Sequence, residues 1–246
     1  MSLFGIVGPI MVGPSSSHTA GAARIGYVTR QIMGEDIVKA QIDLYGSFLA
    51  TGKGHGTDRA LVAGLLGMKP DDYRIPNSFE HAKEAGMEFS FGEAFVRDAH
   101  PNTAVITATG VSGQVRTVEA ASIGGGCIRV NKIDDMEANF TGDYPTLILR
   151  NVDKPGMIQK IVTKLNEFNI NIANFMLSKD MKKKGTAITV IECDDAVPFA
   201  MVDEICEWED IQRVLYLYNE DMVISEETQK RLDEYNNRSK AQRSTN

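Results

Sequence analysis

The chain has 246 residues, of which 43% are hydrophobic and 24% charged, a composition typical of globular proteins with one large or two small domains. Its formal net charge of −7 gives it no general attraction to nucleic acid or to an anionic membrane, because both attract basic surfaces. The chain has no apolar stretch of the roughly 18 residues that a membrane-spanning helix needs, and no basic segment at its start, so we expect a cytoplasmic protein with neither kind of partner.

The stretch from Gly13 to Gly26 (GPSSSHTAGAARIG) has the residues of a reactive loop followed by a helix. We expect a helix from His18 to Met33, capped by Ser16 or Ser17 and ended by Gly34. Its free N–H groups, partial positive charge and surrounding hydroxyls would form a site for a carboxylate or phosphate. An ordinary serine-capped helix with a surface histidine remains the alternative.

A second histidine occurs in a similar setting after a predicted strand over residues 37–45. Residues 47–51 predict a helical turn, and Gly52 to Asp58 (GKGHGTD) predicts a tight loop because it has three glycines in seven residues. Thr57 or Asp58 would cap the next helix, over residues 59–66. The two histidine loops could face one ligand, with His18 and His55 exchanging protons near neutral pH, although His55 could equally be a loop residue without a role.

The next segment combines one polar helix, over residues 78–85, with an antiparallel meander. The meander strands are predicted over residues 104–109, 114–122 and 127–133. The three glycines at 124–126 favour a hairpin corner over a ligand-binding loop, because glycine's conformational freedom explains them. Residues 1–135 therefore predict an α+β domain that is large enough to bury its own core.

A polar and acidic stretch over residues 136–145 predicts a linker to a second module at 146–220. The pattern of this module is strand, helix, strand, strand, helix, strand, which indicates a ferredoxin-like βαββαβ unit. Its strands are expected at residues 146–151, 170–178, 185–192 and 211–218, and its helices from Pro155-Gly156 and over 199–208. The polar tail over residues 221–246 predicts a marginal helix that frays.

The three cysteines, Cys127, Cys193 and Cys206, are widely spaced and form no CxxC pair. Their odd number argues against a disulfide framework, and their spacing argues against a complete zinc or iron–sulfur site within this chain. We expect each to be a small buried apolar residue, and we assign no metal ligand to this chain.

The second module resembles the ACT domain, a ferredoxin-like regulatory unit that commonly binds amino acids. The matching residues are Arg150 to Gly156 (RNVDKPG) and Asn169 to Asn174 (NINIAN). The resemblance implies regulatory amino-acid binding by Asn151, Asp153, Gly156 and Asn171, with the helix start holding the carboxylate and the polar side chains the ammonium group. The alternatives are that these residues merely cap and turn the chain, and that the module forms a homodimer without a ligand.

The first domain resembles the β domain or β subunit of the bacterial iron–sulfur L-serine dehydratases, on the combination of Gly13 to Gly21 (GPSSSHTAG) with Gly46 to Arg59 (GSFLATGKGHGTDR). In that family the [4Fe-4S] cluster is held by cysteines of an α domain, and in some members this domain is a separate chain. The resemblance therefore implies a β subunit that works with an α subunit. The implied reaction is β-elimination of L-serine to pyruvate and ammonia, with the cluster as Lewis acid.

The same resemblance gives roles to residues at matching positions. The residues that would bind the substrate are Ser15, Ser16, Ser17 and Thr19, and those that would be catalytic are His18, His55 and Asp58. The resemblance does not decide which histidine moves the proton. The alternative function is a non-catalytic metabolite-sensing module, with an anion-binding domain coupled to an ACT amino-acid sensor. A serine hydrolase is disfavoured because PSSSH lacks the G-x-S-x-G elbow.

Overall fold

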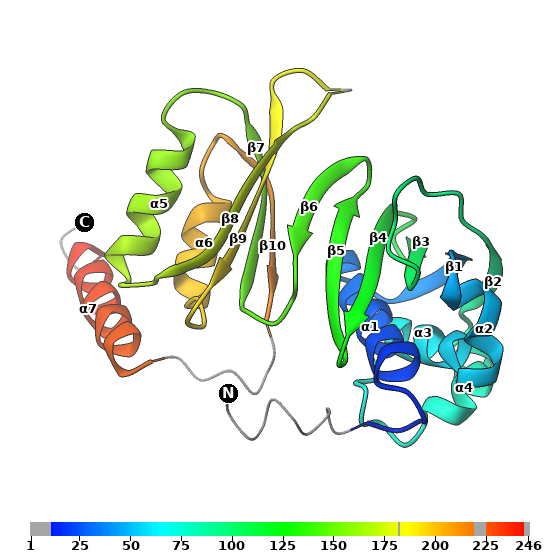
Figure 1. Cartoon of the computed structure of the whole chain (residues 1–246). Helices are drawn as coiled ribbons and strands as arrows, with labels where there is room; N and C mark the ends of the chain where they lie inside the picture. Colours follow the sequence, from blue (N-terminus) through cyan, green and yellow to red (C-terminus); the bar gives the residue numbers. More distant parts are fainter. Residues whose placement is uncertain (1–10, 182, 219–224, 244–246) are drawn as a thin grey trace. The chain divides into compact units, whose positions relative to one another are not determined.

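The computed structural model describes residues 11–181, 183–218 and 225–243. The start of the chain, considered above for an export signal, lies outside these residues, as do parts of the polar tail. The chain divides into two units, Met1–Thr141 and Gly142–Asn246, each described by itself (Figure 1). No helix among the described residues has the length and apolar character needed to cross a membrane.

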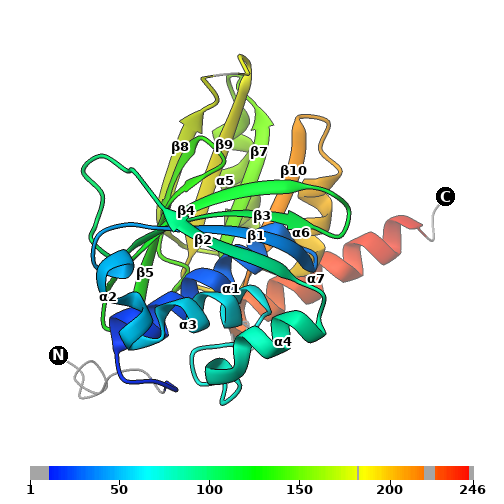
Figure 2. The same cartoon turned by 90° about the vertical axis from the view of Figure 1, so that its right-hand side faces the viewer.

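The first unit is a six-stranded sheet with helices on one face (Figure 2). Its strand order is β2-β1-β3-β4-β5-β6, and every neighbouring pair is antiparallel except β1 and β2. The strands are β1 Ile37–Leu44, β2 Glu88–Glu93, β3 Thr103–Gly110, β4 Val115–Gly124, β5 Cys127–Ile133 and β6 Met136–Phe140. The helices are α1 Gly21–Met33, α2 Ser47–His55, α3 Thr57–Leu65 and α4 Ser78–Glu84, with a short 3₁₀ turn at Ile75–Asn77.

Helix α1 packs against α3 and lies over β3, β4 and β5. The contact with α3 is close because Gly26 and Gly64 have no side chain to separate the two backbones, and a Cβ on Gly26 would lie 2.9 Å from the Gly64 Cα. These contacts hold residues 23–27 of α1 against residues 61–65 at the end of α3.

The helix expected from His18 begins earlier, with a π-helical turn over Ser16–Ala20 that leads into α1. Its cap is Ser15, whose Oγ accepts from the His18 N–H at 3.1 Å, so the expectation of Ser16 or Ser17 as cap was wrong. The end is as predicted, because Gly34 adopts a left-handed conformation with φ 74°.

The expectation of a tight loop from Gly52 to Asp58 was also wrong. Helix α2 continues through Gly52 and Gly54 to His55, and only Gly56, with φ 70°, separates it from α3. Thr57 and Asp58 lie inside the first turn of α3, and Gly56 takes the cap position. The buried Gly52 lets α2 pack against Thr57, whereas Gly56 makes the turn.

Two strands of the first sheet differ from the sequence-based expectation. Strand β2 had no prediction, and β6 occupies the first half of the stretch at 136–145 that was expected to be a linker. In β6 the side chains of Met136, Ala138 and Phe140 are buried in alternation. The glycines at 124–126 form the corner between β4 and β5, as predicted, and all three have positive φ.

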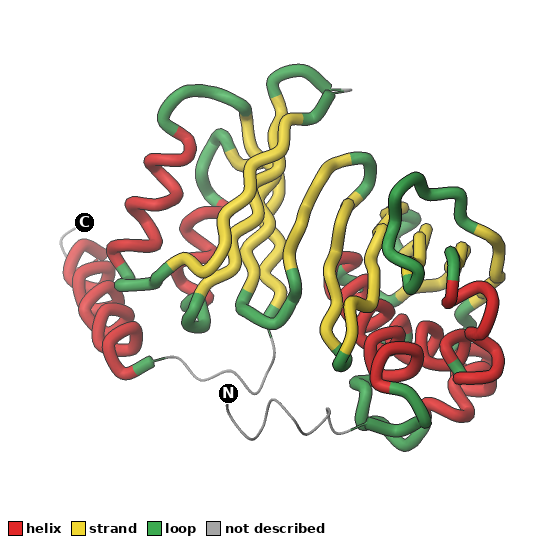
Figure 3. Tube along the Cα trace, viewed as in Figure 1, coloured by secondary structure: helices red, strands yellow, loops and turns green. Residues whose placement is uncertain are grey.

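The second unit has the predicted order of strands and helices, with a sheet of order β10-β7-β9-β8 that is antiparallel throughout. Figure 3 shows α5 and α6 against this sheet. The elements are β7 Thr146–Val152, α5 Met157–Glu167, β8 Ile172–Lys179, β9 Thr186–Cys193, α6 Phe199–Cys206, β10 Ile211–Leu217 and α7 Glu226–Arg243. This order is that of a ferredoxin-like fold.

The core of the second unit joins both helices to one face of the sheet. It includes Leu147 and Ile191 from the sheet, Ile161 and Leu165 from α5, and Ile205 from α6. The expectation that all three cysteines are buried was wrong, because Cys193 is buried whereas Cys127 and Cys206 are exposed thiols.

Candidate functional site

The π-helical turn that precedes α1 fixes the position of His18. Ser15 has an extended backbone and caps the turn through its hydroxyl, while the Gly21 N–H donates to the Ser16 carbonyl and closes the π-helical turn. The side chains of Ser16 and Ser17 lie within this turn and are half-buried. The turn therefore holds the serines and His18 around the N-terminal end of a long helix.

His18 contacts two hydroxyl groups of α2. Its Nε2 lies 3.1 Å from Ser47 Oγ and 3.2 Å from Thr51 Oγ1. Thr51 already donates its hydroxyl proton to the Ser47 carbonyl, at 2.9 Å, so toward His18 it can only accept. This favours the tautomer of His18 with its hydrogen on Nε2, which leaves Nδ1 as the basic nitrogen.

His55 lies beside His18, with 5.0 Å between the ring centroids. Its Nδ1 is 3.1 Å from the Thr51 carbonyl, which only accepts, so this nitrogen holds the hydrogen and Nε2 is left as an acceptor. Thr19 donates its hydroxyl to the His55 carbonyl at 3.0 Å and ties the end of α2 to the first turn. The structure thus brings the two predicted histidines together, although His55 ends a helix.

The surroundings of His18 lower the pKa of its imidazole. Partial burial is the largest cause, the nearby His55 lowers the pKa further, and a hydrogen bond with the backbone of Ser47 opposes both effects. The fully buried ring of Phe48 lies edge-on to the imidazole, with 5.4 Å between centroids, and forms an apolar wall. His18 is therefore neutral near pH 7 and able to accept a proton.

Ser47 and Thr51 were not predicted from the sequence to be site residues. Their spacing could have identified them, because Ser47, Thr51 and His55 follow one another at intervals of four residues and so lie on one face of a helix. The expectation of a loop at Gly52 concealed this spacing.

Asp58, the third residue expected to be catalytic, lies in the first turn of α3. Its Oδ1 accepts from the Arg59 N–H at 2.8 Å. Among the described residues no hydrogen bond or ion pair connects Asp58 with either histidine. The geometry thus places His18, His55 and Thr19 together and leaves Asp58 beside them on the neighbouring helix.

The residues expected to bind a regulatory amino acid lie at two ends of the second sheet. Asn151 is buried at the end of β7 and accepts from Thr189, and Asp153 forms an ion pair with Lys179 at 2.8 Å. Gly156 precedes α5 with φ 89°. Asn171 donates to Asp194 beyond the opposite end of β9, so one chain does not gather these four residues into one set.

The thiols do not fit an iron–sulfur cluster. Burial raises the pKa of the Cys193 thiol to about 12 and also raises the pKa of the Cys206 thiol, which disfavours the thiolates that a cluster needs. The described residues contain no group of three or more histidine, cysteine or acidic side chains that could hold a metal ion.

Comparison with known proteins gives matches that agree with one another. A family model described as serine dehydratase beta chain matches residues 2–88. The chain is 40% identical to the L-serine dehydratase beta chain of Peptoniphilus asaccharolyticus, over 77% of this chain and 86% of that one. It is 37% identical to the probable L-serine dehydratase beta chain of Bacillus subtilis, over 87% of this chain and 96% of that one. An L-serine dehydratase of Mycobacterium bovis is 29% identical over 55% of this chain, but only 34% of that longer protein is covered.

Proposed function

We propose that this chain, which belongs to the serine dehydratase beta-chain family, provides the His18 site for the elimination of water from L-serine and is active only with an α partner. Two relatives that match it over most of their length are L-serine dehydratase beta chains, so the chain is a β subunit of an L-serine dehydratase. The observation that supports the site is the pair of imidazoles formed by His18, in the turn before α1, and His55, at the end of α2, with two hydroxyl groups next to the His18 Nε2.

The start of α1 suits the carboxylate of L-serine. Helix N-termini attract anions through free N–H groups and the helix dipole. The Ser15 hydroxyl is used in capping, which leaves Ser16 and Ser17 as the side chains that would contact the substrate. The carboxylate would then lie next to the imidazole of His18.

His18 is our choice for the base that removes the α-proton. Its pKa is lowered, so the imidazole is unprotonated near neutral pH, and Ser47 and Thr51 hold Nε2 so that Nδ1 accepts the proton. His55 would assist by placing its own imidazole nitrogen next to this base. Loss of the hydroxyl group as water gives an enamine, which hydrolyses to pyruvate and ammonia.

Because the thiols of this chain do not fit a cluster, we assign the [4Fe-4S] cluster to the α partner. We assign no metal ligand to this chain, so each of its residues in the elimination acts on the substrate or on a proton. The alternative of a non-catalytic sensing module is not favoured, because both beta-chain relatives are named for an enzyme. Regulatory amino-acid binding by the second unit stays a prediction.

Reconstitution tests this function. The purified chain and an α chain from the same genome are assayed anaerobically with L-serine, separately and mixed, and pyruvate is measured. We expect pyruvate only from the mixture. Pyruvate formed by this chain alone, or none from a mixture in which the α chain holds its cluster, would contradict the proposal.

A further inference from the structure

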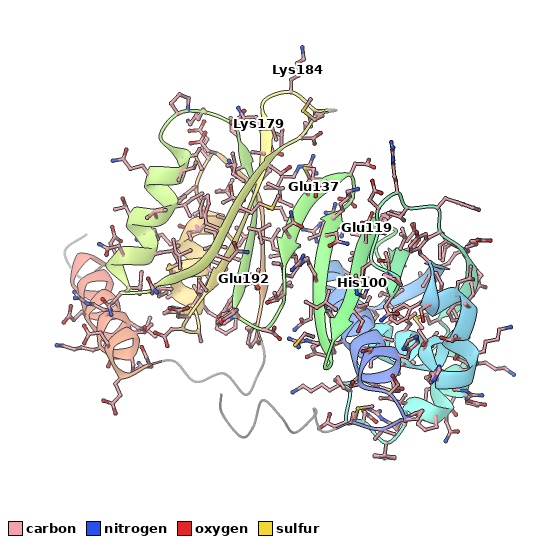
Figure 4. All side chains as sticks on the ribbon, viewed as in Figure 1. His100, Glu119, Glu137, Lys179, Lys184 and Glu192 are labelled. Carbon is pink, nitrogen blue, oxygen red and sulfur yellow. The ribbon has the colours of Figure 1, made fainter. Side chains whose placement is uncertain are left out.

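Ser122 ends a buried row of side chains on the face of β4 that helix α1 covers. Side chains alternate along a strand, so Val118, Ala120 and Ser122 share one face of β4, and all three are buried. Glu119, labelled in Figure 4, lies between the first two and so belongs to the opposite face, where it pairs with Lys132. A hydroxyl group therefore stands in a position where the strand otherwise packs apolar side chains against α1.

The hydroxyl of Ser122 has no hydrogen-bond partner in the part of the chain that the structure describes, although the residue is 0% exposed. Its Oγ points at Gly21, the first residue of α1, because a Cβ built on that glycine would lie only 2.1 Å from this oxygen. The same Cβ would lie 3.6 Å from the carbonyl oxygen of Ser16. The hydroxyl thus fills the space that a side chain on residue 21 would take, beside the π-helical turn that begins at Ser16.

Backbone hydrogen bonds hold Ser122 in this place and connect it with the His18 site. The Ser122 N–H donates to the Asn102 carbonyl at 3.0 Å, and the Asn102 side-chain amide donates to the Ser122 carbonyl at 3.5 Å. The preceding residue, Pro101, accepts from the N–H of Ser47 at 2.7 Å, and the Ser47 hydroxyl contacts His18. The unpaired hydroxyl is therefore fixed beside the start of α1, next to the elements that carry the two imidazoles.

A buried hydroxyl without an acceptor opposes folding, because water leaves it and nothing replaces the lost hydrogen bond. Native proteins keep few such groups, and departures from local rules of this kind are concentrated at functional sites. A carboxylate supplies what is missing, since its oxygens only accept hydrogen bonds and a serine hydroxyl can donate one. The start of α1 is also where free N–H groups would hold a carboxylate.

We propose that Ser122 binds the carboxylate of L-serine by donating its hydroxyl hydrogen to it. This inference rests on the proposed function, because it takes L-serine as the ligand at the start of α1. The oxygen is shielded from solvent in this structure, so the carboxylate reaches it when the π-helical turn over Ser16–Ala20 shifts. Turns of this form are rare and occur frequently at functional sites.

The test compares Ser122→Ala with wild type in the reconstituted enzyme, from initial rates of pyruvate formation over a range of L-serine concentrations under anaerobic conditions. The variant should raise KM at least about tenfold, because a hydrogen bond to a charged group is lost. The fall in kcat/KM should come mainly from KM, since the carboxylate is bound in the ground state and in the transition state alike. Urea unfolding of the full-length β chain should show a midpoint no lower than that of wild type, because alanine removes a hydroxyl that has no partner.

The matched control is Ser78→Ala. Ser78 is also fully buried, but its Oγ donates to the Arg59 carbonyl at 2.7 Å. Its replacement should lower the urea midpoint, because the carbonyl loses its donor, and should leave KM at the wild-type value. The two serines should therefore separate substrate binding from stability in opposite directions.

Three outcomes overturn the inference while the wild-type mixture remains active, which leaves the proposed function intact. A wild-type KM in Ser122→Ala rejects the contact with the carboxylate. A lower kcat at unchanged KM rejects it as well, because the residue would then act through His18. A urea midpoint as low as that of Ser78→Ala shows that the hydroxyl has a partner within this chain. A wild-type mixture that forms no pyruvate, by contrast, rejects the proposed function and the inference together.

Discussion

At the scale of single residues, the site depends on which nitrogen of each histidine holds its hydrogen. The carbonyl of Thr51 fixes the His55 tautomer, and the hydroxyl of the same residue contacts Nε2 of His18. One residue of α2 therefore orients both imidazoles. Neither tautomer could be assigned from the sequence, because these partners come from a helix that the glycines around His55 concealed.

The pH dependence of the reconstituted enzyme should follow from the environment of His18. Its lowered pKa means that the basic form is present at neutral pH and is lost only as the pH falls below the ordinary value of 6.5. We expect kcat/KM to be constant around pH 7 and to fall on an acid limb that lies below pH 6.5. Because His55 is one cause of the lowered pKa, His55→Gln should move this limb to higher pH.

The matched control for this profile is His81→Gln. His81 lies on α4 and contacts Glu84, on a separate helix from the site. Its replacement should leave the limb in place. A wild-type limb above pH 6.5, or a limb that His55→Gln does not move, would show that the active base is a different group.

At the scale of elements, the errors of sequence reading have physical causes. Glycine favours turns in general, but Gly52 and Gly54 lie in helical backbone, and the burial of Gly52 against Thr57 is a tertiary effect that local sequence does not reveal. Around β6, the acidic residues Asp134, Asp135, Glu137 and Asp143 concealed the alternation of Met136, Ala138 and Phe140. The βαββαβ order of the second unit was predictable because its four strands are seven or eight residues long, whereas β2 has six residues and β6 five.

The contact between α1 and α3 can be tested through its glycines. A Cβ on Gly26 would overlap the Leu61 carbonyl, so Gly26→Ala should lower the free energy of unfolding by roughly 1–3 kcal/mol. Gly54 has nothing near its Cβ position and lies in helical backbone, so Gly54→Ala should raise that free energy by about 0.5–1 kcal/mol. Urea unfolding followed by circular dichroism measures both. Equal effects of the two substitutions would contradict the close packing of these helices.

At the scale of the whole molecule, the residues to which we assign a chemical role all lie in the first unit. The family model matches only residues 2–88, and His18, Ser47, Thr51 and His55 fall within them. The division into an α+β unit and a ferredoxin-like unit could be predicted from the sequence, whereas the order β2-β1-β3-β4-β5-β6 could not, because it depends on pairings between distant segments. The second unit holds the residues for which a regulatory role is predicted.

The most direct test of the central claim is the rate of pyruvate formation by His18→Ala, assayed anaerobically with L-serine and a saturating α chain. Loss of a positioned base should lower kcat by about 10²-fold or more, while the Kd for the α chain stays that of wild type. A wild-type kcat in this variant would contradict the assignment of the His18 site to the elimination reaction.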